Sequence, residues 1–208
     1  MSTKAHKSFE RTLERVDAML EAHKIVTRQQ GRPPRFLSDI LRSTIILIIA
    51  SLDSYLHDVI QERVYHYVSI RKGKNLHKKL LETFKDAVPY EKVFRVWFSA
   101  RPSVHIATAV RKRNADRTFI NPDKIEEALQ IVGIDDIWVL AARKFRRRKD
   151  GLKTLFKAYA DRRNKIVHEG DAFRVTRKKG ELRSIRRPYV EQCYSDVKKF
   201  VDVVEKAI

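Results

Sequence analysis

Residues 161–169, DRRNKIVHE, place a possible proton-transfer group and possible phosphate ligands on one short piece of chain. His168 can exchange a proton near neutral pH, and the planar guanidinium of Arg163 can hold a phosphate. Asn164 can donate and accept hydrogen bonds. If the segment is helical, Asn164 and His168 share one face, whereas Arg163 lies about 140° away from His168. An imidazole beside a guanidinium suits a phosphodiester and would make a poor metal site.

Two arrangements would bring these groups together: a relaxed last helical turn, or a second copy of the helix across a dimer axis. Gly170 is a typical helix terminator, so His168 is expected in the last turn, where the helix dipole favours a protonated imidazole. The alternative interpretation is a solvated helix end with an ordinary C-terminal histidine.

The string RNKIVH, Arg163 to His168, resembles the signature of the HEPN superfamily (higher eukaryotes and prokaryotes nucleotide-binding). Its ribonuclease members carry an arginine, four to six further residues and a histidine, often with a polar residue directly after the arginine. Asn164 occupies that polar position. Arg162 also satisfies the spacing, with five intervening residues, and Arg163 is preferred because Asn164 follows it.

Two further stretches extend the resemblance over most of the chain from about residue 38. Residues 48–60, IIASLDSYLHDVI, look like the upstream helix of the superfamily, which often carries an acidic residue facing the motif. Asp53 matches that position best, and Asp58 is second. Residues 117–136, RTFINPDKIEEALQIVGIDD, followed by DRRNKIVHEGD, are similar to the RiboL-PSP type of HEPN domain.

The resemblance implies a helical bundle that dimerises by placing two motif helices side by side, with one composite cleft for metal-independent cleavage of single-stranded RNA. His168 would be the general base or acid, and Arg163 would hold the scissile phosphate. Asn164 would orient these groups, and Asp53 would position Arg163. The expected products are a 2′,3′-cyclic phosphate and a 5′-hydroxyl, and no cofactor is expected. Alternatively, Asp53 pairs with Arg163 only to stabilise the bundle.

Enzymes of this kind act as toxins or antiviral-defence effectors, so an antitoxin or another defence-system protein is a candidate partner. The runner-up hypothesis is a non-catalytic HEPN module that binds RNA or a partner protein through the same helices. A third class is a basic adaptor for anionic membranes.

The charge of the chain favours a polyanionic partner. It has 45 Lys and Arg against 26 Asp and Glu, a net charge of +19, and such an excess most often serves nucleic-acid binding. A basic surface kept for solubility is the alternative. The candidate RNA-binding residues precede the motif, lie within it and follow it: Arg143, Lys144, Arg146, Arg147, Arg148, Arg162, Lys165, Arg174, Arg177 and Lys178. We expect them to flank the cleft from both sides and to bind the RNA backbone without sequence preference.

Apolar residues at helical spacing predict an all-α, HEPN-like bundle forming a single domain over residues 1–208. A helix over residues 1–30 should pack on a core of about residues 38–208. Ser38 is the predicted N-cap of a long central helix that reaches about Val68 and is apolar nearly all round near Ile45. Asn121 and Pro122 should begin a helix that Gly133 ends. The motif helix should run from about residue 150, and a short hairpin or ordered loop should precede a last helix near residue 188.

Several classes of site are disfavoured. The single cysteine, Cys193, excludes an intrachain disulfide and a cysteine-cluster zinc site, and its helical position predicts burial in the core. His57, His66 and His105 have no spacing that suggests a metal site. The longest apolar run, IILIIA at residues 45–50, is too short to cross a bilayer, and the first residues do not resemble a signal peptide. We therefore expect a cytoplasmic protein without a membrane partner.

Overall fold

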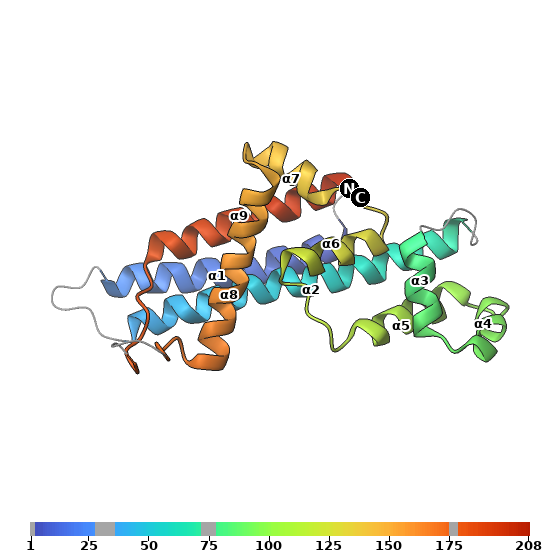
Figure 1. The fold of residues 1–208 in the computed structure, drawn as a ribbon, viewed down its shortest axis with the longest axis horizontal. Helices are drawn as coiled ribbons and strands as arrows, with labels where there is room; N and C mark the ends of the chain where they lie inside the picture. Colours follow the sequence, from blue (N-terminus) through green and yellow to red (C-terminus); the bar gives the residue numbers. More distant parts are fainter. Residues whose placement is uncertain (1–2, 28–35, 72–77, 175–178) are drawn as a thin grey trace.

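The computed structural model describes residues 3–27, 36–71, 78–174 and 179–208. These residues form nine α-helices and no strand, which confirms the predicted all-α class (Figure 1). The helices are α1 (Lys4–Thr27), α2 (Leu37–Arg71), α3 (Lys78–Ala87), α4 (Tyr90–Trp97), α5 (Pro102–Asn114), α6 (Pro122–Ile131), α7 (Ile137–Phe145), α8 (Lys149–Glu169) and α9 (Arg187–Ala207).

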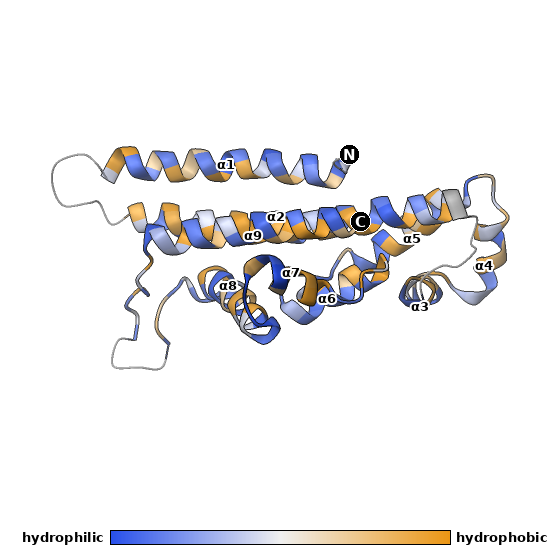
Figure 2. Cartoon of the chain, turned by 90° about the horizontal axis from the view of Figure 1, so that it is seen from above, coloured by the Kyte–Doolittle hydropathy of each residue, from blue (hydrophilic) through white to orange (hydrophobic). Residues whose placement is uncertain are grey.

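The long α2 is the central helix of the bundle. Seen from above, α1 forms one outer layer, α2 and α9 the middle, and α3 to α8 the other side (Figure 2). Ile45, Ile48 and Leu52 are fully buried on α2, because its apolar residues face helices on several sides. By length and composition α2 could cross a membrane, but here just over half of its most apolar window is buried inside the fold.

An aromatic cluster holds the motif helix α8 in place. Trp138 of α7, Phe156 of α8 and Phe200 of α9 are buried, with ring centroids 5.0–5.4 Å apart. Beside them, Tyr159 Oη donates to Asp196 Oδ2 on α9 at 2.8 Å. Large buried rings resist sliding because any shift opens cavities, so α8 has a defined direction across α2 and α9 (Figure 1).

Local signals in the sequence place most helix ends correctly. Asn121 precedes α6, Pro122 is its first residue, and Gly133 follows with φ of 84°. Gly170 caps α8 in the left-handed conformation, with φ of 59°. The predicted N-cap Ser38 is wrong. The helix α2 begins at Leu37, and Ser38 lies in its first turn with Oγ accepting a hydrogen bond from Arg42 Nη1 at 2.6 Å.

The predicted hairpin or ordered loop before α9 is present in part. Ala172 and Leu182 form an isolated antiparallel bridge, and Phe173 N–H donates to the carbonyl of Glu181 at 2.9 Å. Residues 175–178, which include the predicted RNA ligands Arg177 and Lys178, lie outside the described residues. The bridge returns the chain toward the end of α8.

Candidate functional site

The motif occupies the last two turns of α8. Arg163 is half-buried, and its Nη1 donates to Asn164 Oδ1 at 3.1 Å. His168 is exposed one turn after Asn164, and its ring makes no hydrogen bond or ion pair to any described residue. The imidazole is therefore open to solvent, while one guanidinium nitrogen is held by the neighbouring amide.

Arg163 and His168 leave α8 on different sides. Arg163 follows the buried Phe156 by seven residues, and therefore continues the buried stripe of the helix, with its Nε buried. His168 instead follows the exposed Asp161 by seven residues, and therefore lies on an exposed side of the helix. Helix α8 continues to Glu169, so the first of the two suggested arrangements, a relaxed last turn, is not found. One chain by itself does not direct both groups at one phosphate.

The carboxylate next to the motif is Asp171. It is completely buried, and its Oδ2 accepts from Arg162 Nη2 at 2.7 Å and from Arg42 Nε at 2.8 Å. We call Asp171, Arg42 and Arg162 the Asp171 clamp. Asp171 adopts φ of 61°, directly after the cap Gly170, a conformation that Asp tolerates better than most residues. The clamp therefore ties the end of α8 to the beginning of α2.

The clamp also holds the segment before α9. Arg42 Nη2 donates to the carbonyl of Arg183 at 2.8 Å, and Arg162 Nη2 donates to that of Ser184 at 3.0 Å. Nη2 of Arg162 is thus held by protein groups, whereas Arg163 makes one side-chain hydrogen bond, through Nη1. Both arginines that fit the motif spacing keep guanidinium nitrogens without a hydrogen bond to a described residue, Nη1 and Nε in Arg162 and Nη2 and Nε in Arg163, although both Nε atoms are buried. The RNA contact of Arg162 stays a prediction: Asp171 holds its Nη2, and its side chain lines a hollow beside α8.

The expected pairing of Asp53 with Arg163 is not formed among the described residues. Asp53 Oδ1 accepts the backbone N–H of Phe119 at 2.6 Å, and His57 Nε2 lies 3.8 Å from the same oxygen. Asp53 is eleven residues after Arg42, about 16 Å along α2 from the clamp. Its observed contact fastens the segment before α6 to the central helix, which joins the two stretches that carry the family resemblance.

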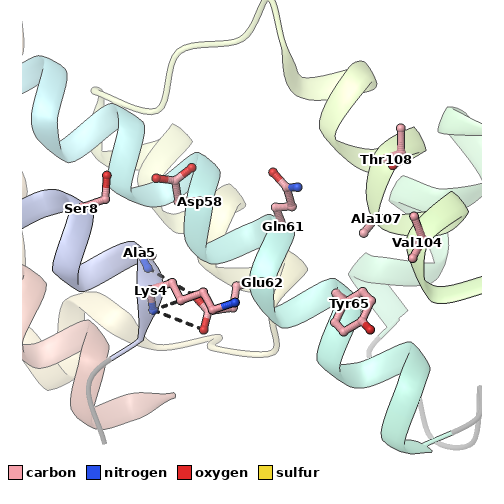
Figure 3. A pocket seen from close by; sticks show the side chains of 10 residues that line it. All are labelled: Lys4, Ala5, Ser8, Asp58, Gln61, Glu62, Tyr65, Val104, Ala107 and Thr108. Atoms are coloured by element: carbon pink, nitrogen blue, oxygen red, sulfur yellow. Dashed lines mark hydrogen bonds between the residues drawn. The ribbon is translucent and has the colours of Figure 1, made fainter.

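Asp58, the second candidate carboxylate, also lies away from the motif. It lines a hollow of about 470 Å³ between the start of α1, α2 and α5 (Figure 3). In the same hollow, the backbone N–H groups of Lys4 and Ala5 donate to Glu62. Burial raises the pKa of Asp58, Glu62 raises it further, and the neighbouring His57 opposes the shift. The hollow is not part of the motif site.

The basic run before the motif lies at the opposite end of α8. Its side chains are exposed around the α7–α8 junction: Arg143, Lys144, Arg146, Arg147 and Arg148. Because α8 rises 1.5 Å per residue, Arg148 is about 30 Å from His168. Within one chain the basic run and the motif are therefore far apart, and the flanking of one cleft from both sides stays a prediction. Adjacency in sequence did not give adjacency in space, since a straight helix separates the groups.

Other cations do gather at the motif end. Arg174 Nη2 donates to the carbonyl of His168 at 2.9 Å, and the predicted RNA ligand Lys165 is exposed on α8. A hollow of about 500 Å³ lies between α8 and the start of α9, lined by Asp161, Arg162, Lys165, Arg183, Arg186 and Tyr189 among others. Burial raises the pKa of Tyr189 to about 12, so its hydroxyl stays a hydrogen-bond donor there.

Sequence reasoning missed Arg42, Asp171 and Arg183 as parts of this region. A signal existed for two of them: Arg42 is a lone arginine beside the apolar core of α2, and Asp171 directly follows the cap Gly170. Among the described residues, no three His, Cys, Asp or Glu side chains gather as a metal site would require.

Comparison with known proteins gives one assignment. The model of the RiboL-PSP-HEPN family matches residues 10–208, nearly the whole chain. No curated protein and no solved structure gives a significant match. The matched region contains the Arg163–His168 motif, Asp53 with the segment that it holds, and the Asp171 clamp. The chain is a member of the RiboL-PSP-HEPN family.

Proposed function

We propose that this protein is a metal-independent endoribonuclease that cleaves single-stranded RNA in a cleft formed by two copies of α8. Membership of a HEPN family supports an RNA-related role, and the net charge of +19 supports a polyanionic substrate. The observation that carries the proposal is the end of α8. There Asn164 holds Arg163, and the imidazole of His168 lies in solvent one turn further on.

Because Arg163 and His168 lie on different sides of one α8 helix, the proposed cleft needs α8 from a second copy of the chain. Val167 follows Arg163 by four residues and Asn164 by three, so it neighbours both on the helix surface. It is 43% exposed, an apolar side chain among polar motif residues. Pairing two α8 helices about a two-fold axis would cover Val167 and bring the arginine of one chain toward the histidine of the other.

The chemistry of such a cleft is internal transesterification. One His168 would take the proton of the ribose 2′-hydroxyl, and the 2′-oxygen would form a bond to phosphorus. The bond from phosphorus to the 5′-oxygen would break, and the second His168 would give that oxygen a proton. Arg163 would stabilise the negative charge that develops on the phosphoryl oxygens. The products are a 2′,3′-cyclic phosphate and a 5′-hydroxyl.

The hollow beside the motif supports a path for the RNA backbone. Lys165 and Arg186 are exposed at its wall, next to the partly buried Arg183. A second hollow, which includes Lys153 and Lys157, shares Asp161 with it and continues along α8 toward α6. A backbone lying in these hollows would be bound mainly through charge, so its affinity would fall as salt rises.

In the cell, such a nuclease would act in the cytoplasm as a toxin or an antiviral-defence effector. A partner such as an antitoxin or another defence-system protein would restrain it until it is needed. The competing hypothesis is a non-catalytic HEPN module that binds RNA or a protein through the same helices.

The deciding experiment incubates the purified protein with end-labelled single-stranded RNA in EDTA and analyses the ends of the products. We expect cyclic-phosphate ends from the wild type and none from His168→Ala. The matched control is His105→Ala, because His105 is also an exposed helical histidine but lies on α5. Sedimentation should show a dimer for all three proteins. Binding without cleavage by the wild type would favour the non-catalytic module, and full activity of His168→Ala would refute the site.

A further inference from the structure

Three exposed aromatic side chains form a stripe along α4. Tyr90, Phe94 and Phe98 follow one another at intervals of four residues, with exposed fractions of 81%, 66% and 80%. Among the described residues these are the most exposed large apolar side chains. The rings of Phe94 and Phe98 are parallel within 3°, with centroids 6.4 Å apart. We call these three residues the α4 stripe.

The α4 stripe is not required to attach α4 to the fold. A different side of α4 does that, because Val93, Val96 and Trp97 are half-buried and pack against the core. The ring of Trp97 lies 6.4 Å from that of Phe84 on α3. An exposed apolar surface that folding does not use indicates a binding surface.

The surroundings of the α4 stripe are basic. Residues 78–117 carry ten Lys and Arg against four Asp and Glu. Lys92, Arg95 and Arg101 are exposed on or next to α4. One of the four carboxylates, Asp86, is already paired with Arg113 at 2.8 Å. A second copy of this chain would bring two such basic surfaces together, which repulsion disfavours, whereas a polyanion would be attracted.

We propose that the α4 stripe is a stacking platform for the bases of single-stranded RNA, remote from the Arg163–His168 site. Exposed rings interleaved with cations are the combination by which proteins hold single strands, because every base offers a π-face and every nucleotide a phosphate. The inference rests on the proposed function in one respect, the identity of the substrate as RNA. In Figure 1, α4 lies at the end of the long axis away from the last turns of α8. The platform would therefore hold RNA distant from the scissile bond and contribute to affinity.

The test separates ring stacking from apolar docking. In Phe94→Leu/Phe98→Leu the apolar surface remains and the rings are removed, whereas Phe94→Tyr/Phe98→Tyr keeps the rings. Fluorescence anisotropy with a labelled oligouridine should show affinity lowered about tenfold or more for the leucine pair and nearly unchanged for the tyrosine pair. A strand of equal length and charge without bases should bind the wild type and both variants equally. Both variants should have the same melting temperature as the wild type, since these side chains are exposed.

Catalysis distinguishes failure of this inference from failure of the proposed function. On a long RNA, the leucine pair should raise KM and leave kcat unchanged. If the wild type cleaves RNA and the leucine pair binds oligouridine as tightly as the wild type, the platform is wrong and the nuclease stands. An equal loss of oligouridine affinity in the leucine and tyrosine pairs would also contradict stacking. So would a leucine-pair loss of affinity for the strand without bases as large as its loss for oligouridine. If the wild type neither binds nor cleaves RNA, both proposals fail.

Discussion

Asp171 Oδ2 lies 2.7 Å from Arg162 Nη2, and the carboxylate that accepts this hydrogen bond is completely buried. The same oxygen accepts a second hydrogen bond from Nε of Arg42, which lies on α2, 129 positions earlier in the chain. The two adjacent arginines of the motif therefore have different contacts. Arg162 Nη2 fixes the end of α8 in the fold, whereas the side chain of Arg163 bonds only to Asn164 among the described residues.

Replacing Asp171 with Asn should destabilise the protein strongly. The change leaves the buried guanidinium of Arg42 and the half-buried one of Arg162 facing a neutral amide, and breaking a buried ion pair typically costs about 3–5 kcal/mol. Urea unfolding followed by circular dichroism measures the loss. The control is Asp39→Asn, because Asp39 also pairs with Arg42, at 3.0 Å, but is largely exposed, so its loss should cost less than about 1 kcal/mol. Equal stability of the two variants would contradict the clamp.

Replacing Asp53 with Asn should leave both folding and RNA cleavage nearly unchanged. The amide oxygen of Asn can still accept the backbone N–H of Phe119, which is the hydrogen bond observed. Asp53→Ala removes the acceptor and should cost about 1–3 kcal/mol, the typical effect of leaving a buried donor unsatisfied. Thermal melts and cleavage rates of the two variants check this. A loss of kcat in Asp53→Asn, with the stability of the wild type, would instead support a role of Asp53 in positioning Arg163.

Replacing Asp58 with Asn should stabilise the protein slightly at neutral pH. Burial raises the pKa of Asp58, so folding opposes its ionisation, and the cost is fully present above the folded-state pKa. As pH falls below the ordinary value of 3.8, the carboxyl is protonated in both states and the cost disappears. We expect a gain of less than about 1 kcal/mol at pH 7 because the group is only partly buried. Chemical denaturation at pH 7 and near pH 3 should show the gain only at the higher pH.

Two matched charge deletions test where the RNA backbone lies. Lys165→Ala/Arg186→Ala removes two exposed cations beside the motif, and Arg146→Ala/Arg147→Ala removes two from the far end of α8. The first pair should weaken RNA binding and lower the salt dependence, by about one unit of slope for each phosphate that is no longer neutralised. The second should have little effect on a short RNA, since about 30 Å of helix separates it from His168. The reverse order of effects would place the RNA path at the α7–α8 junction.

Much of this protein is determined by local sequence. Helical periodicity, the Asn121–Pro122 start of α6 and the Gly170 cap each act within one or two turns, so the sequence predicts them. The Arg163–His168 motif, together with the stretches at residues 48–60 and 117–136, predicts the family that the comparison shows. The partners of buried charges were decided only by tertiary structure. The buried Asp171 accepts a hydrogen bond from Arg42, and the half-buried Asp53 accepts one from the backbone N–H of Phe119. Carboxylates that are removed from water must bond to donors that the packed helices bring near them, and no periodic sequence pattern encodes which donors those are.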